Sequence, residues 1–293
     1  MTRIDLHTHT LNSDGTFTPR ELVALAVRNG LGALALTDHD TPAGLEEAIL
    51  AAKEHEIEFV PGIEISTHYN RKELHLLGLF IDWRARAMTD AVEHWRSIRR
   101  ERNAELLARL HSAGIYICMG QIESLAQHNS TGSAIITRSH FARAITDAGY
   151  CTSPQNAFSK YLLPGTPTYV ERQEISPADA ISAIRSAGGL AILAHPLRYG
   201  LNLRQIEPII KSLQSDGLNG MECYYSSHTP YEQEQLIRIA KKYRLCISGG
   251  SDFHGFHDGT MLGTGYGSLY VPMFVYDELK ELKERLTLAD GQA

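Results

Sequence analysis

The sequence of 293 residues has few cysteines and no long apolar run. Its four cysteines, Cys118, Cys151, Cys223 and Cys246, are scattered and form no CxxC pair. We therefore expect reduced cysteines in a cytoplasmic protein, rather than a disulfide framework or a thiolate zinc site. No apolar run approaches the roughly 18 residues that span a bilayer. The N-terminus lacks a stretch of signal-peptide type, so we expect neither a membrane anchor nor export.

Positive charge is also scarce. The chain has 28 lysines and arginines against 34 aspartates and glutamates, which gives a formal net charge of −6. This balance argues against a protein that coats nucleic acid without specificity, because such binding depends on positive potential. It leaves room for an enzyme with a local basic pocket. Histidine, by contrast, is abundant: there are 14, and several adjoin carboxylates.

Short apolar runs alternate with amphipathic helical patterns in both terminal parts of the chain. Strand-like runs occur at 4–6, 33–36, 58–65, 190–194, 220–224 and 245–248. This rhythm predicts a parallel sheet or barrel. The runs 63–67 and 73–81 are separated only by residues 68–72, which predicts a β-hairpin and brings the total to seven strands.

The middle of the chain differs. Residues 84–165 carry helical patterns and few strand signals. We therefore predict an α/β barrel built from residues 1–83 and 166–288, interrupted by a helical insertion domain at 84–165 that contributes to substrate binding.

Histidines and carboxylates gather where the predicted strands end. His7 and His9 lie two positions apart, so on a strand their imidazoles point to the same face. In barrels, the carboxyl ends of the strands are where catalytic groups collect. Each cluster alone has an ordinary alternative, such as a helix cap or a surface histidine. Together they predict one pocket ringed by His7, His9, Asp14, His39, Glu64, His75, His195, Asp252 and His254.

His75 falls near a strand start, which the hairpin would explain. If the turn centres near Asn70-Arg71, Ser66 lies opposite His75, and Glu64 is its diagonal neighbour on the same face. Nitrogen and oxygen donors in this number exceed what one ion needs, so we expect two or three divalent metal ions. Imidazole with carboxylate suits Mn²⁺, Fe²⁺ or Zn²⁺.

The motifs DLHTHT with Asp14, TDHD, GIEIS, ELHLLG, AHP and SDFH, in this order, resemble those of the PHP (polymerase and histidinol phosphatase) family of metal-dependent phosphoesterases. The resemblance covers nearly the whole chain. It implies a distorted (β/α)7 barrel, the PHP fold, and a trinuclear centre built by the nine residues above. It also makes Mn²⁺ the first expectation, with Fe²⁺ and Zn²⁺ as alternatives.

Three further segments, at 137–143, 160–162 and 195–199, are similar to one branch of the family. That branch includes a nucleoside 3′,5′-bisphosphate phosphatase and a related 5′→3′ exoribonuclease that trims short RNA. The resemblance implies hydrolysis of the 5′-phosphate of a nucleoside 3′,5′-bisphosphate, or removal of 5′ nucleotides from short 5′-phosphorylated RNA, through attack by a metal-bridged hydroxide. His195 and Asp252 are the candidates for protonating the leaving 5′-oxygen.

Arg138, His140, Arg198 and Lys160 are candidates for holding a second phosphate, because the planar guanidinium fork matches phosphate oxygens. The alternative for Arg138 is a solvated position on a helix of the insertion. Two other functions stay open: a small-metabolite phosphatase such as histidinol-phosphate phosphatase, or a noncatalytic metal- or nucleotide-binding module. The sequence gives no sign of an obligate protein partner.

Overall fold

The computed structural model describes residues 2–70, 72–126, 136–170, 175–256 and 259–290. Seven strands form one sheet in the order β1-β2-β3-β4-β5-β6-β7, which confirms the predicted number of strands. In chain order the strands are β1 (Arg3–Asp5), β2 (Leu31–Leu36), β3 (Glu58–Tyr69), β4 (Lys72–Leu79), β5 (Leu190–Leu193), β6 (Gly220–Tyr225) and β7 (Cys246–Gly250).

The sheet curves into a nearly closed barrel. β4 pairs antiparallel with β3 and β5, and the other neighbouring strands pair in parallel. Beyond the ends of β1 and β7, Thr8 forms a parallel bridge with Phe253, and the His9 amide donates to the Phe253 carbonyl at 2.9 Å. These bonds join the first strand to the last and confirm the predicted α/β barrel.

The register of the β3–β4 hairpin agrees with the sequence-based prediction. Tyr69 pairs with Lys72 at the turn, and Ser66 lies opposite His75. Because β4 runs against its neighbours, a residue near its start lies at the same end of the barrel as the carboxyl ends of the parallel strands. His75 therefore joins the other predicted site residues.

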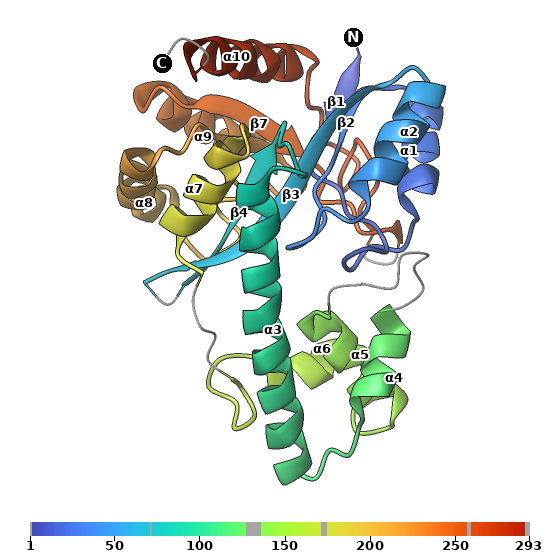
Figure 1. Cartoon of the computed structure of the whole chain (residues 1–293). Helices are drawn as coiled ribbons and strands as arrows, with labels where there is room; N and C mark the ends of the chain where they lie inside the picture. Colours follow the sequence, from blue (N-terminus) through green and yellow to red (C-terminus); the bar gives the residue numbers. More distant parts are fainter. Residues whose placement is uncertain (1, 71, 127–135, 171–174, 257–258, 291–293) are drawn as a thin grey trace.

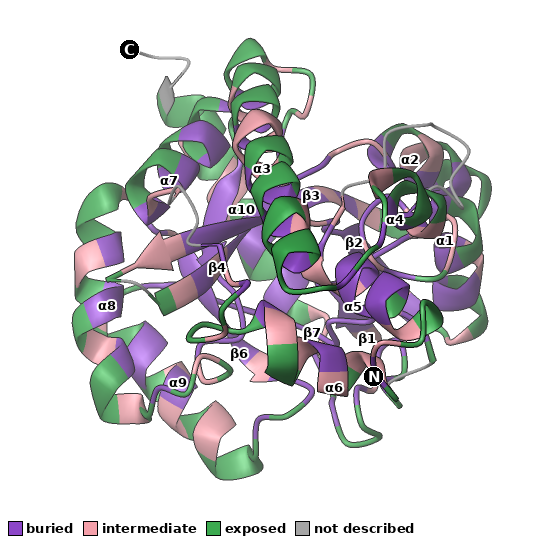
Figure 2. Ribbon diagram, turned by 90° about the horizontal axis from the view of Figure 1, so that it is seen from below, coloured by how far each residue is buried: buried purple, intermediate pink, exposed green. Residues whose placement is uncertain are grey.

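Helices cover the outside of the barrel (Figure 1). The helices that pack on the strands are α1 (Pro19–Arg28), α2 (Leu45–Glu54), α7 (Pro177–Ser186), α8 (Leu203–Asp216), α9 (Pro230–Lys242) and α10 (Phe274–Asp290). Local sequence fixes where several begin. At the start of α1 the Thr18 side chain accepts the Glu21 amide, and the Glu21 side chain accepts the Thr18 amide. These two bonds form a complete capping box. Figure 2 shows that buried residues concentrate on the strands and on the inward faces of these helices.

The remaining helices lie between β4 and α7 in the chain. They are α3 (Arg86–Ser112), α4 (Met119–Ala126), α5 (Arg138–Asp147), α6 (Pro154–Ala157) and the π-helix η1 (Phe158–Leu162). The first half of α3 packs on the barrel through Met88, Val92 and Trp95, while Leu106 and Leu110 belong to a second apolar cluster shared with α4, α5 and η1. One helix thus connects two cores. The boundaries at 83/84 and 165/166 remain predictions.

In the part of the chain that the structure describes, no helix has the length and apolar character needed to cross a membrane.

Candidate metal centre

The nine predicted residues meet at the carboxyl end of the barrel, although seven segments of the chain supply them. Glu64 and His75 lie on the paired strands β3 and β4. His39 lies just after β2, and its backbone bridges that of Glu64. The others follow β1, β5 and β7 or lie in the loop that holds Asp14.

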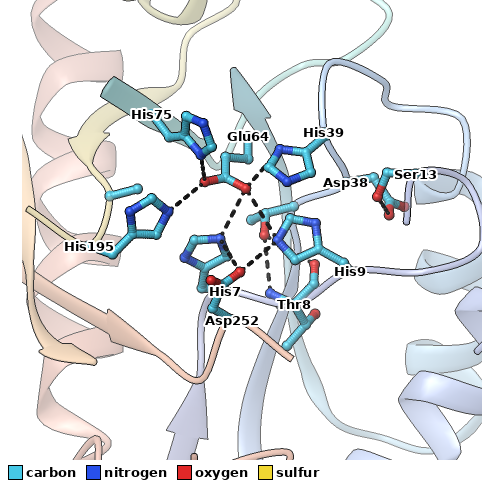
Figure 3. A network of polar contacts seen from close by, with 12 residues as sticks. His7, Thr8, His9, Ser13, Asp38, His39, Glu64, His75, His195 and Asp252 are labelled. Atoms are coloured by element: carbon cyan, nitrogen blue, oxygen red, sulfur yellow. Dashed lines mark hydrogen bonds and ion pairs between the residues drawn. The ribbon is translucent and has the colours of Figure 1, made fainter. Parts of the chain in front are cut away.

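The Glu64 carboxylate is at the middle of the cluster and is fully buried. Its Oε2 faces three histidines and its Oε1 faces two more, as Figure 3 shows. The ring nitrogens lie at 3.3 Å (His7), 3.2 Å (His9), 3.0 Å (His39), 2.8 Å (His75) and 3.0 Å (His195). A carboxylate so placed can bridge two cations.

Two aspartates complete the arrangement. Asp252 Oδ1 lies 3.3 Å from Nε2 of His7 and 3.2 Å from Nε2 of His9. Asp14 Oδ1 lies 3.2 Å from Nε2 of His254. These contacts leave the predicted ligand set in one continuous cluster.

The donor atoms fit divalent cations. Three groups of donor atoms each converge within 4.8 Å: His9, Asp14, His39 and His254; His7, His9, Glu64 and Asp252; and His39, Glu64 and His75. Several of these atoms are buried without a hydrogen bond, among them Nε2 of His7 and His9, Oε2 of Glu64 and Oδ1 of Asp252. Buried polar atoms without partners are costly, and a cation at each group would satisfy them.

The electrostatics of the cluster are strongly coupled. Burial raises the pKa of the Glu64 carboxyl, but His39, His7 and His75 outweigh burial and hold it well below its usual range. Burial lowers the pKa of His39 to about 3. For His75, burial also lowers the pKa, but Glu64 and Glu73 outweigh it and raise the pKa to about 9.

Sequence reasoning missed a carboxylate that holds two of these histidines. Glu222 on β6 is fully buried, both of its oxygens lie 3.1 Å from Nδ1 of His7, and its Oε2 accepts the backbone amide of His195 at 2.7 Å. An acidic residue within the otherwise apolar run 220–224 was the available signal.

Two other buried aspartates fix the loops that carry several of the predicted ligands. Asp38 accepts the Thr10 amide at 2.7 Å, the Thr10 hydroxyl at 2.6 Å and the Ser13 hydroxyl at 2.6 Å. Asp5 accepts the amides of Ser251 and Gly263, each at 2.8 Å. Burial raises the pKa of both carboxyl groups, that of Asp5 to about 6. They lie in the DLHTHT and TDHD motifs but belong to none of the three donor groups.

A cavity of about 800 Å³ opens onto the cluster. It is lined by seven of the predicted ligands, by Glu73, Arg198 and Tyr199 from the barrel, and by Arg138, Ser139, His140, Arg143, Pro154 and Gln155 from α5 and α6. Helices α5 and α6 therefore form the part of the cavity wall that the barrel does not supply. Lys160 is exposed on η1 and is absent from the described residues that line the cavity.

Three of the four predicted phosphate-binding residues, Arg138, His140 and Arg198, each contact a neighbouring residue. Arg138 donates to Glu73 Oε2 at 2.8 Å. Nδ1 of His140 accepts the Thr137 amide at 3.0 Å, and burial lowers the pKa of this imidazole, so the neutral ring carries its proton on Nε2. Arg198 contacts Asp252 Oδ2.

Asp252 has a further partner that the sequence did not suggest. Tyr225, the last residue of β6, donates its hydroxyl hydrogen to Asp252 Oδ2 at 2.8 Å, and Arg198 donates to the same hydroxyl oxygen at 2.9 Å. Asp252 thus turns one oxygen to the histidines and keeps the other bound by Tyr225 and Arg198.

The comparisons with known proteins agree with this geometry. Residues 5–286 match the family model described as the PHP domain. The chain belongs to the PHP domain family. It is 38% identical over 259 residues to the 3′,5′-nucleoside bisphosphate phosphatase of Chromobacterium violaceum, covering 88% of this chain and 90% of the relative. It is 38% identical over 257 residues to the 5′-3′ exoribonuclease Rnm of Escherichia coli K12, covering 85% of this chain and 84% of the relative.

A solved structure of an amidohydrolase from Chromobacterium violaceum, with bound sulfate and no metal, superposes with a TM-score of 0.83 at 35% identity and covers 96% of each chain. These relatives, with the buried donor clusters, identify this PHP protein as a metal-dependent phosphoesterase.

Proposed function

We propose that this PHP protein hydrolyses the 5′-phosphate of nucleoside 3′,5′-bisphosphates and removes 5′ nucleotides from short 5′-phosphorylated RNA. One observation carries the proposal. The donor cluster and the basic residues Arg138 and His140 line the same cavity, so one phosphate can lie at the centre while another reaches the insertion. The names of the similar relatives support the same substrates.

The nine residues of the cluster would hold two or three divalent ions, with Mn²⁺ as the first expectation and Fe²⁺ or Zn²⁺ as alternatives. Such ions, when bound, lower the pKa of bound water from about 16 to about 7 and neutralise phosphoryl oxygens.

Arg138 and His140 bind the 3′-phosphate in this proposal. The guanidinium of Arg138 offers paired N–H donors, and the neutral His140 ring offers its Nε2 hydrogen, because its Nδ1 is already occupied by the Thr137 amide. The 3′-phosphodiester of an RNA chain would occupy the same place, so one site serves both reactions. Arg198 and Lys160 remain candidates for contacts with the rest of the substrate.

The leaving 5′-oxygen needs a proton, for which His195 and Asp252 are the candidates. Burial raises the pKa of Asp252, but His7 and His254 outweigh burial and hold it well below its usual range, so this carboxylate is a poor acid. Burial lowers the pKa of the His195 imidazole as well, so His195 and Asp252 both stay candidates for this proton.

Purified protein with Mn²⁺ should convert adenosine 3′,5′-bisphosphate to adenosine 3′-monophosphate and should shorten 5′-phosphorylated oligoribonucleotides from the 5′ end. His9→Ala should abolish both activities. The kcat/KM for the bisphosphate should exceed that for histidinol phosphate. Inactivity on both nucleotide substrates, in protein shown by elemental analysis to contain metal, would refute the proposed substrates.

A further inference from the structure

Glu73, the first residue of the ELHLLG motif, connects the metal centre to the phosphate site and was not among the predicted ligands. It lies near the start of β4, two positions before His75. Its Oε1 is 3.2 Å from Nε2 of His75, and its Oε2 accepts Nη2 of Arg138 at 2.8 Å. Both ends of the Arg138–Glu73 pair are partly shielded, with 21% and 29% of the side chains exposed. One carboxylate therefore contacts a histidine of the centre and a cation of the insertion.

Glu73 occupies Nη2 of Arg138, one of the two nitrogens that a phosphate binding the guanidinium in a bidentate manner would use. Carboxylate and phosphate are both good partners for this fork, and the two anions repel each other at close range. A 3′-hydroxyl carries no charge and cannot compete with the carboxylate for Arg138. Occupancy of the phosphate site and the Arg138–Glu73 bond thus oppose each other.

We propose that Glu73 competes with the 3′-phosphate for Arg138 and regains the guanidinium as the product leaves. The inference rests on the proposed function. Hydrolysis at the 5′ position leaves the 3′-phosphate untouched, so substrate and product make the same contact with Arg138. Binding energy shared by both states holds the product as firmly as the substrate. A competing carboxylate weakens that hold and releases the nucleoside 3′-phosphate.

Glu73 also positions His75. Nδ1 of His75 lies 2.8 Å from Glu64, while Nε2 faces Glu73. A carboxylate on the far nitrogen of a ligand histidine fixes the ring, so removing the charge of Glu73 affects the centre as well as the phosphate site. A test must separate the two effects.

Adenosine 3′-monophosphate provides that separation, because it lacks the scissile phosphate. Its dissociation constant can be measured by calorimetry on the metal-loaded full-length protein. Glu73→Gln should bind it about tenfold more tightly than the wild type, because the amide keeps the shape but carries no charge to compete for Arg138. In the Arg138→Gln background, Glu73→Gln should give no such gain. Glu234→Gln removes the exposed partner of Arg238 on α9 and is the matched control, with unchanged binding.

Kinetics give a second readout. In Glu73→Gln, product inhibition by adenosine 3′-monophosphate should strengthen and the KM for the bisphosphate should fall. The KM for a 5′-monophosphate should stay constant, and a loss of kcat on both substrates would report the altered His75. Glu73→Asp, which keeps the charge but shortens the side chain, should also tighten product binding.

Unchanged product affinity in Glu73→Gln overturns the competition. So does a gain that persists without Arg138, which would reflect removal of a repulsive charge alone. Failure of the proposed function would look different: the wild type would not hydrolyse the bisphosphate. A protein that hydrolyses the bisphosphate but shows no effect of Glu73→Gln refutes only this inference.

Discussion

Glu222 on β6 lies 3.1 Å from Nδ1 of His7, which follows β1, although 215 positions separate them in the chain. The contact leaves Nε2 of His7 facing Glu64 and Asp252. The same carboxylate accepts the backbone amide of His195, so it fixes two residues of the centre at once. Ligand histidines in proteins commonly have their second nitrogen held in this way.

Glu222→Gln should therefore weaken metal binding by about 10- to 100-fold, with a similar loss of activity. The amide removes the negative charge that faces the His7 ring and places an N–H group where one carboxylate oxygen now contacts Nδ1 of His7. Metal content after dialysis against graded metal buffers, measured by elemental analysis, would check the expectation. Glu123→Gln, on the exposed face of α4, is the control. Metal affinity equal to that of the wild type would exclude the assigned role.

Tyr225→Phe should lower activity about tenfold by removing one hydroxyl. The Tyr225 hydroxyl donates to Asp252 Oδ2 at 2.8 Å, and a hydrogen bond to a charged group contributes about 1.5–3 kcal/mol. Without it, Arg198 alone holds Asp252 Oδ2, and the orientation of Oδ1 toward His7 and His9 is less firmly fixed. Steady-state kinetics with the bisphosphate would measure the loss. The neighbouring Tyr224→Phe should leave kcat unchanged, and equal effects of the two variants would contradict the prediction.

Asp38→Ala should destabilise the fold rather than only the centre. Asp38 accepts three hydrogen bonds from Thr10 and Ser13, and all of these groups are buried. Removing the acceptor leaves buried donors unpaired, at roughly 1–3 kcal/mol each. Urea denaturation should show a loss of about 3 kcal/mol or more in the free energy of unfolding. The exposed Asp216→Ala should lose almost none, and a similar small loss in Asp38→Ala would refute the role.

The sequence predicted the barrel and the convergence of the candidate ligands, because both follow from local patterns. Apolar runs marked the strands, and the short gap between β3 and β4 allowed only a hairpin. With the turn placed, strand pairing set Ser66 against His75, as the structure confirms. Polar residues at strand ends then had to meet, because parallel strands present their carboxyl ends at one edge.

The residues that support the ligands did not follow from such patterns. On a regular strand, side chains three positions apart point to opposite faces, so Glu222 and Tyr225 should not share a site. The pairing of β6 with β7 shifts register between Glu222 and Tyr224, and this irregularity lets both side chains reach the centre. A bulge of this kind leaves no clear mark in the sequence.

Lys160 is a residue that the sequence assigned to the phosphate site and that the described part of the structure does not place there. A local motif placed it among the phosphate ligands, but η1 holds it exposed on the insertion, outside the described lining of the cavity. Resemblance of a short segment says which residues are present. It does not say how a separately packed helix turns them, so the role of Lys160 stays a prediction.

Metal binding should release protons and strengthen as pH rises. Burial lowers the pKa of His254, but Asp14 and Asp252 outweigh burial and raise this pKa to about 10. The pKa of His75 is raised to about 9. At pH 7 both rings are therefore protonated before metal arrives, whereas a ligand imidazole must be neutral. Each released proton makes the apparent affinity about tenfold tighter per pH unit, until the pH reaches the pKa of that ring.

Calorimetric titration with Mn²⁺ in buffers of different ionisation enthalpy would count the protons. His254→Asn should release about one fewer than the wild type, and His55→Asn, at an exposed position, should release the same number. Binding that releases no proton and does not change between pH 6 and pH 8 would show that these imidazoles do not become ligands.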